Sequence, residues 1–196
     1  MRRTWTGESE VIVTFDGEIE DANTQALAYA AAARASGGHD DVIVGARSVM
    51  LVFPKNGVPR VPVVEPARAP EGGRLHEIDV TYGGEDLDDV AELTGLSAGD
   101  VVRAHASAEY RVAFIGFSPG FPYLLGLPRR LHVPRLSTPR ARVPAGSVAI
   151  ADRYSGIYPD ATPGGWRLIG RTGMKLFDAG AGASVQPGDR VHFVPR

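Results

Sequence analysis

Hydrophobic and polar residues alternate in short runs through the first part of the chain, and one longer run has the composition of a helix. Residues 10–15 alternate in the manner of a β-strand. Residues 26–35 are rich in alanine, follow potential cap residues at 21–24 and stop at Gly37-Gly38, which predicts a helix. Two more strands are predicted at 41–44 and 48–53. This order, strand-helix-strand-strand, is most of a ferredoxin-like α/β unit.

The second helix and fourth strand of such a unit would have to come from the next segment, which is rich in proline. Proline removes a backbone donor and breaks helices, so we expect an irregular crossing segment and an incomplete unit. Residues 65–73 have the composition of a linker. The sequence therefore predicts a first domain at 1–73 and a second at 74–196. The prolines concerned are Pro54, Pro59, Pro62, Pro66 and Pro70.

The second part of the chain begins with a strand pattern at 75–82 and two short helix patterns at 85–93 and 97–107. Ser97 is suited to cap the second helix, with Asp100 three positions on as the partner in a capping box. Strands are predicted after that at 110–114, 147–151, 166–170, 175–178 and 190–194. A domain with so many strands protects its edges best by closing. The fold class predicted is α+β, with a mostly β second domain.

Composition and charge narrow the classes of function. The 196 residues are 43% hydrophobic and 22% charged with a net charge of −2, so the chain as a whole is not expected to bind nucleic acid or an anionic membrane electrostatically. It contains no cysteine, which excludes disulfides and thiolate metal sites; the five histidines show no metal-binding spacing, so no metal is expected.

The first ten residues lack the apolar core of a signal peptide, and no run reaches the roughly 18 apolar residues of a membrane span. A cytoplasmic location is expected.

Proline, glycine, aromatic residues and arginine are concentrated between residues 115 and 172. Two interpretations remain open: these loops turn corners in a small β domain, or they form a concave surface with aromatic walls and guanidinium groups at its rim. Six arginines and one acid lie between Arg129 and Arg153, a pattern that suits a solvated face or a clamp for carboxylate or phosphate. The candidate substrate-binding residues are Phe117, Ser118, Gly120, Phe121, Tyr123, Arg135, Arg140, Ser147, Tyr158, Trp166 and Arg171.

Two segments come close to catalytic motifs. Gly165 to Thr172 nearly fits a phosphate-binding loop, with Arg171 at the lysine position, but the intervening residues are strand-like and no helix pattern follows. Ser118 lies between Gly116 and Gly120, as in a nucleophile elbow, yet Pro119 has no N–H to give to an oxyanion hole. Neither a nucleotide-binding loop of this type nor a serine hydrolase is favoured, and no catalytic residue is assigned.

Taken together, these segments resemble the family of 5-oxoprolinase B subunits, also labelled KipI-like or allophanate hydrolase subunit 1. The resemblance spans residues 75–195 and its longest motif is Gly116-Phe117-Ser118-Pro119-Gly120-Phe121-Pro122-Tyr123-Leu124. The other motifs are Tyr82-Gly83-Gly84, Pro134-Arg135, Pro139-Arg140, Val143-Pro144-Ala145-Gly146-Ser147-Val148, Gly156-Ile157-Tyr158-Pro159, Pro163-Gly164-Gly165-Trp166, Ile169-Gly170-Arg171-Thr172 and Gly188-Asp189-Arg190-Val191. The amino-terminal part matches only in pattern.

The resemblance implies a cyclophilin-like β-barrel behind a small α/β domain, working as one subunit of a heteromeric enzyme. Such a complex, with the family's C subunit and a third lactam-handling subunit, would open 5-oxo-L-proline to L-glutamate using ATP, and this chain would not be active alone. Other members of the family suggest two alternatives: subunit 1 of a urea carboxylase or allophanate hydrolase type of carboxyltransferase, which would use biotin, or an inhibitor of a sensor histidine kinase. The substrate-binding residues above would line a site shared between chains.

Overall fold

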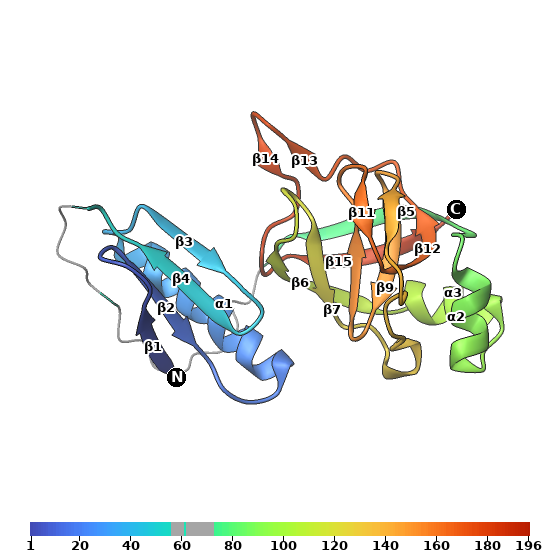
Figure 1. Cartoon of the computed structure of the whole chain (residues 1–196), viewed down its shortest axis with the longest axis horizontal. Coiled ribbons are helices and arrows are strands. Elements are labelled where there is room, and N and C mark those ends of the chain that lie inside the picture. Colours follow the sequence, from blue (N-terminus) through green and yellow to red (C-terminus); the bar gives the residue numbers. More distant parts are fainter. Residues whose placement is uncertain (56–60, 62–72) are drawn as a thin grey trace. The chain divides into compact units, whose positions relative to one another are not determined.

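The computed structural model describes residues 1–55, 61 and 73–196 (Figure 1). The chain divides into two compact units, Met1–Gly73 and Arg74–Arg196. Nearly all of the proline-rich crossing segment and of the predicted linker lies outside the described residues.

The amino-terminal unit is a four-stranded antiparallel sheet with one helix on it (Figure 1). The strand order is β1 (Arg2–Trp5), β2 (Glu10–Thr14), β4 (Ser48–Val52) and β3 (Asp41–Val44). Alternate residues of the sheet are buried under α1 (Ile19–Ser36), among them Val11, Val49 and Leu51. The predicted strand-helix-strand-strand order is confirmed.

The edge strand that completes the sheet, β1, comes from an unexpected part of the sequence. In a ferredoxin-like unit the fourth strand lies beside the first; here β1, which precedes the first strand, pairs with β2 along Arg2–Trp5 and occupies that edge. All four residues of β1 are exposed, so no apolar alternation in the sequence predicts this strand. The half-exposed ring of Trp5 lies 6.2 Å from that of Phe53.

Helix α1 begins earlier than predicted, at Ile19, and Glu18 at its N-cap makes no capping hydrogen bond. The potential cap residues at 21–24 lie inside the helix, where Asn23 is buried and donates from Nδ2 to the Ala46 carbonyl at 3.2 Å. Tertiary contacts therefore override the preference of these residues for a helix terminus. The helix ends as predicted, with Gly37 at φ 66°.

The carboxy-terminal unit is a closed seven-stranded barrel, in agreement with the predicted cyclophilin-like β fold (Figure 1). Strands β5 and β15 run parallel and the other neighbours antiparallel. In barrel order the strands are β10 (Tyr154–Ile157), β7 (Pro122–Leu125), β6 (Glu109–Ile115), β15 (Arg190–Pro195), β5 (Leu75–Tyr82), β12 (Arg167–Arg171) and β9 (Ser147–Ala151).

Short elements surround the barrel. Helices α2 (Leu87–Thr94) and α3 (Ala98–Ala106) lie side by side, and the hydroxyl of Ser97 caps α3 by accepting from the Asp100 N–H, as predicted. The remaining pieces are η1 (Arg129–Leu131) and two ribbons, β8 (Arg140–Val143) with β11 (Thr162–Gly164) and β13 (Phe177–Asp178) with β14 (Gly182–Ala183). No helix in the described part of the chain combines the length and the apolar character needed to cross a membrane.

In the barrel interior, a series of hydrogen-bonded polar side chains lies among apolar side chains. His105, which is fully buried, contacts the Tyr82 hydroxyl through Nδ1 at 2.7 Å and the Ser155 hydroxyl through Nε2 at 2.9 Å. Ser155 also donates to the Ala149 carbonyl at 3.3 Å. Burial lowers the pKa of His105 to about 3, so the imidazole is neutral at physiological pH.

Candidate functional site

The turn between β6 and β7 holds Phe117 in solvent with a rare backbone conformation. Phe117 has φ 66°, and the Ser118 N–H donates to the Gly116 carbonyl at 2.7 Å, which makes a γ-turn of the strained kind. Its ring is 62% exposed, the highest fraction among the large hydrophobic side chains described. Gly120, at φ 80°, lies against Phe177 and the Leu176 carbonyl with no room for a Cβ. The turn is thus fixed at Gly120 and displays an aromatic ring at Phe117.

Five predicted aromatic residues converge on one hollow, which we call the aromatic hollow. It has a volume of about 60 Å³ and is lined by Phe117, Phe121, Tyr123, Arg135, Tyr158, Gly164, Gly165 and Trp166. The rings meet edge to face: Phe121 lies 5.0 Å from Tyr158 and 5.3 Å from Trp166, and Phe117 lies 5.4 Å from Phe121. Phe121, Tyr158 and Trp166 are buried, so these walls are preformed.

Two hydrogen-bond donors face these apolar walls. The Arg135 guanidinium lies over the Trp166 ring at 5.8 Å, and its ion pair with Asp152 is long, at 3.9 Å. The Tyr158 hydroxyl accepts a hydrogen bond from the Trp166 backbone N–H, so its own proton is free to be donated. Burial raises the pKa of Tyr158, which keeps that proton in place. The hollow therefore suits a small group with an apolar body and an oxygen acceptor.

Arg140 is not part of this hollow but is tied to carboxylates. Its Nη2 donates to Asp86 Oδ1 at 2.7 Å, and its Nε donates to Glu85 at 3.3 Å. Asp86 is buried and its other oxygen accepts from the Leu168 N–H at 2.6 Å. The hydrogen bond to Asp86 raises the pKa of Arg140. This arginine has a structural role, although its buried Nη1 has no partner among the described residues.

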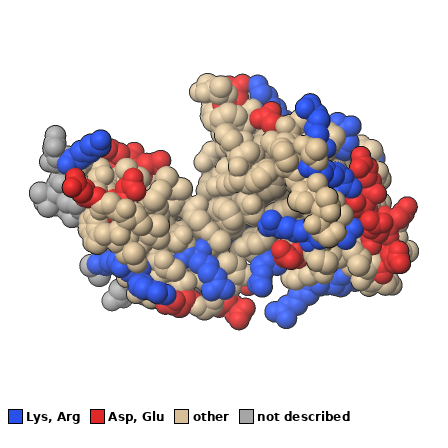
Figure 2. Space-filling view, viewed as in Figure 1, with Lys and Arg blue, Asp and Glu red and all other residues tan. Residues whose placement is uncertain are grey.

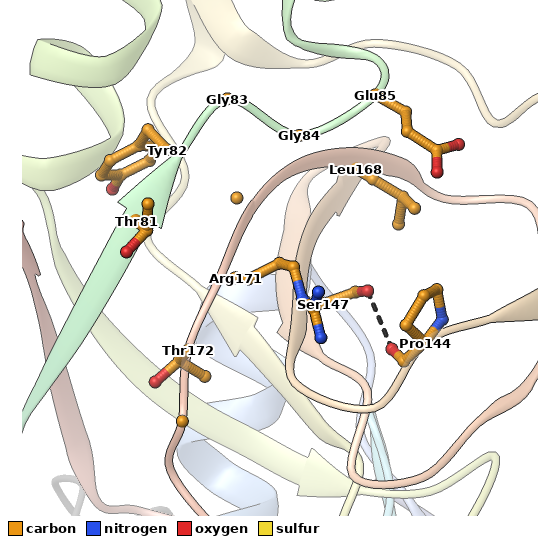
Figure 3. A pocket seen from close by; sticks show the side chains of 12 residues that line it. Thr81, Tyr82, Gly83, Gly84, Glu85, Pro144, Ser147, Leu168, Arg171 and Thr172 are labelled. Carbon is orange, nitrogen blue, oxygen red and sulfur yellow. Dashed lines mark hydrogen bonds between the residues drawn. The ribbon is translucent and has the colours of Figure 1, made fainter.

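Ser147 and Arg171 line a second and larger depression, which we call the glycine-lined groove (Figure 3). Its volume is about 480 Å³, and it runs between the ends of β5 and β12 and the loop before β9. Ser147 is buried and donates to the Pro144 carbonyl at 2.8 Å. The residues lining it are Thr81, Tyr82, Gly83, Gly84, Glu85, Pro144, Ser147, Leu168, Gly170, Arg171, Thr172 and Gly173.

The predicted single concave surface is thus two surfaces. The aromatic residues and Arg135 share the hollow, Ser147 and Arg171 lie in the groove, and Ser118 and Gly120 shape the turn without lining either. Arginines do not gather into one clamp: on the face seen in Figure 2 they form separate groups on the barrel unit, while acids collect on the side of α2. The pairing of the strands determines which depression each residue lines. The spacing of the residues in the sequence does not reveal that pairing.

The near-match to a phosphate-binding loop is a strand. Residues Arg167–Arg171 form β12, and no helix follows Thr172 in the described chain, which continues to Arg196, so the amide cradle of such a loop is not formed here. Ser118, in the near-match to a nucleophile elbow, has a buried hydroxyl with no partner in the described residues. Thr172 and the Tyr82-Gly83-Gly84 turn also line the groove; they are absent from the predicted binding residues, although both belong to motifs that carry the family resemblance.

Comparison with known proteins places the chain in a family. The family model for the carboxyltransferase domain, subdomain C and D, matches residues 1–185. The chain belongs to this family. It is 53% identical over 128 residues to the B subunit of 5-oxoprolinase from Escherichia coli O157:H7 and 47% identical over 126 residues to the B subunit from Bacillus subtilis strain 168. The resemblance inferred from the motifs is confirmed.

These matches cover only part of each protein. They include 63% and 62% of this chain, and 59% and 52% of the Escherichia coli and Bacillus subtilis relatives. The crystal structure of TTHA0988 superposes on 95% of this chain, with a TM-score of 0.83 and 35% identity, although that is 40% of its own length. The Kluyveromyces lactis urea carboxylase covers 99% of the chain, which is 21% of its own length, with a TM-score of 0.69 at 16% identity; this is a likeness of fold.

Proposed function

We propose that this chain is one subunit of a heteromeric, ATP-dependent 5-oxoprolinase that opens 5-oxo-L-proline to L-glutamate. The observation that carries the proposal is the 47–53% identity, over 126–128 residues, to three curated relatives named as 5-oxoprolinase B subunits. The partners are a C subunit and a third, lactam-handling subunit. A complex that consumes ATP and a small metabolite would work in the cytoplasm.

In this proposal the aromatic hollow receives the substrate. 5-Oxoproline is a compact apolar ring with one carboxylate and one amide carbonyl. The Arg135 guanidinium suits the carboxylate, and the free proton of the Tyr158 hydroxyl suits the carbonyl oxygen, on which negative charge grows as water adds to the amide carbon. That charge is lost when the carbonyl re-forms, the C–N bond breaks and the ring nitrogen takes a proton. The aromatic rings keep other water away from that oxygen, which strengthens both interactions.

The size and chemistry of the hollow support the proposal that a second polypeptide completes the site. Its volume of about 60 Å³ is well below the roughly 300–1,000 Å³ of pockets that enclose a whole ligand. Its lining contains no carboxylate, histidine or serine to act as a base or nucleophile. Another chain must therefore cover the substrate and supply the proton transfer, and we expect this subunit to be inactive alone.

A second candidate function follows from the family itself, whose model describes a carboxyltransferase domain. In that case the chain would be subunit 1 of a urea carboxylase or allophanate hydrolase type of enzyme, and the hollow would hold the carboxyl acceptor or carboxybiotin. Either function would use the same apolar walls and guanidinium.

Reconstitution tests both functions. The purified chain is mixed with its candidate C subunit and third subunit, and glutamate release from 5-oxoproline is followed with and without ATP. We expect release only when every component and ATP are present. ATP turnover that depends on urea and a biotinylated carrier would favour the second function instead. Failure to form any complex with a C subunit would contradict both and would favour a regulator of a kinase.

A further inference from the structure

The glycine-lined groove owes its open space to backbones that approach one another closely. A Cβ at Gly84 would lie 2.5 Å from the Leu168 carbonyl oxygen, so the turn after β5 packs directly on β12 without an intervening side chain. Gly83 and Gly84 donate their N–H groups to the Ile169 carbonyl at 3.2 and 3.1 Å. The space left beside this contact, about 480 Å³, is within the range of pockets that hold small molecules.

This groove contains a guanidinium that has no carboxylate partner among the described residues. Arg171 pairs in register with Thr81 of β5 and Ser147 of β9, and Figure 3 shows its side chain extending toward Ser147 and Pro144. Arg140 and Arg167, in contrast, each bind an acid, at 2.7 Å (Asp86) and 3.0 Å (Asp89). Arg171 has no ion pair with any residue that the structure describes.

Two hydroxyl groups line the groove together with Arg171: Ser147 lies on the side toward which the guanidinium extends, and the Thr172 side chain points away from the guanidinium (Figure 3). Thr172 Oγ1 accepts from the Met174 N–H at 3.2 Å, which leaves its proton free to be donated. The Ser147 hydroxyl already donates its proton to the Pro144 carbonyl. The one carboxylate of the lining, Glu85, lies across the groove from Thr172 (Figure 3) and is paired with Arg140 at 3.3 Å. The end of the groove at Arg171 is therefore cationic, with the guanidinium as its main donor.

We propose that this end of the groove is an oxyanion-binding site, in which Arg171 holds a phosphate of a nucleotide. A carboxylate has the same donor requirements, but the aromatic hollow already offers Arg135 to the one carboxylate of the lactam, and it is too small for a nucleotide. The inference rests on the proposed function, which requires ATP and the lactam together. It assigns the two ligands to two different surfaces of one barrel.

The test uses nuclear magnetic resonance of the full chain titrated with inorganic pyrophosphate, ATP and 5-oxoproline in turn. We expect pyrophosphate and ATP to shift the amide signals of Gly83, Arg171, Thr172 and Gly173. We expect 5-oxoproline to shift those of Gly164, Gly165 and the Trp166 indole. Groove signals that move with 5-oxoproline and not with pyrophosphate would overturn the assignment to phosphate.

Variants of exposed arginines sharpen the test. Arg171→Ala removes charge-assisted hydrogen bonds and should weaken pyrophosphate binding by roughly tenfold to a hundredfold. Arg171→Lys keeps a point charge but loses the planar guanidinium that can donate two hydrogen bonds at once. Its affinity for pyrophosphate should lie between those of the wild type and Arg171→Ala. Arg142→Ala is the matched control, because Arg142 is exposed on β8 and lines neither surface. Equal pyrophosphate affinity in Arg171→Ala and the wild type would overturn the inference.

This result is separable from the proposed function. If the reconstituted complex releases glutamate while pyrophosphate leaves the groove unperturbed, the site is wrong and the function stands. If pyrophosphate binds through Arg171 while the complex shows no lactam opening, the oxyanion site stands and the function is wrong.

Discussion

Phe117 combines two features that an ordinary loop residue avoids, a positive φ and an exposed aromatic ring. A non-glycine residue in such a conformation costs on the order of 1–3 kcal/mol. Its ring forms one rim of the aromatic hollow, where Phe121 and Tyr158 lie beneath it. A backbone conformation of this cost is explained if the Phe117 ring serves to contact a ligand and does not serve to stabilise the fold.

That account predicts opposite behaviour for two neighbouring phenylalanines. Phe117→Ala should change the free energy of unfolding by no more than about 0.5 kcal/mol, whereas Phe121→Ala, at a buried position, should cost about 3–5 kcal/mol. Both should weaken binding of 5-oxoproline. Denaturant unfolding measures the first effect, and a loss of stability in Phe117→Ala as large as that in Phe121→Ala would show that Phe117 belongs to the core.

The buried side chain of His105 should make the free energy of unfolding depend on pH. Its pKa is about 3 in the folded chain, through burial, and near 6.5 when unfolded. Between these values the unfolded state binds the extra proton, so the free energy of unfolding is greatest above pH 6.5 and falls as the pH decreases, by up to about 1.4 kcal/mol per unit. His105→Gln should flatten this slope between pH 6.5 and 5, measured by urea unfolding. His192→Gln, at an exposed position, is the control; equal slopes in all three proteins would contradict the account.

Among the secondary-structure elements, Asp86 is the link that holds the start of α2 to β12 and β8. It is the N-cap residue of α2, accepts from the Leu168 N–H and binds Arg140 of β8. Asp86→Ala leaves a partly buried guanidinium and a buried N–H without their acceptor, so a loss of about 3 kcal/mol is expected. Asp89→Ala breaks only the more exposed pair with Arg167 and should cost less than about 1 kcal/mol. Thermal unfolding of the two variants side by side checks the difference.

Elements with a periodic pattern were predictable and elements without one were not. The strands at 41–44 and 48–53 and the Ser97-capped helix were found because their apolar faces or caps are local signals. Strands β7 and β10, in contrast, contain Pro122 and Gly156 and carry no clear alternation. Strand β1 is exposed on both faces. Pairing with distant strands stabilises these elements, and such pairing leaves little trace in a short window of sequence.

The candidate site shows the same limit. The motifs brought the aromatic, glycine and arginine residues together as one set, because these side chains are conspicuous together. They did not reveal that Arg140 binds Asp86, 54 residues earlier in the chain, or that Arg171 faces a different depression from Arg135. Those assignments depend on the register of β12 against β5 and β9.

At the scale of the whole molecule, the barrel unit offers a small apolar hollow with a guanidinium and a larger groove with another. Neither surface contains a complete catalytic set: the hollow's lining has no base, and the groove's carboxylate is engaged by Arg140. Under the proposed function, this chain would bind and orient ligands while another chain contributes the chemistry. The designation of its relatives as subunits agrees with that division.

The most direct measurement is steady-state kinetics of the reconstituted complex, with each arginine replaced in turn by alanine. Arg135→Ala should raise the KM for 5-oxoproline at least about tenfold, as expected for the loss of a charge-assisted hydrogen bond, and leave the KM for ATP near that of the wild type. Arg171→Ala should do the reverse, and Arg142→Ala should change neither. Wild-type KM values for both substrates in Arg135→Ala would contradict the claim that this barrel's aromatic hollow binds the lactam.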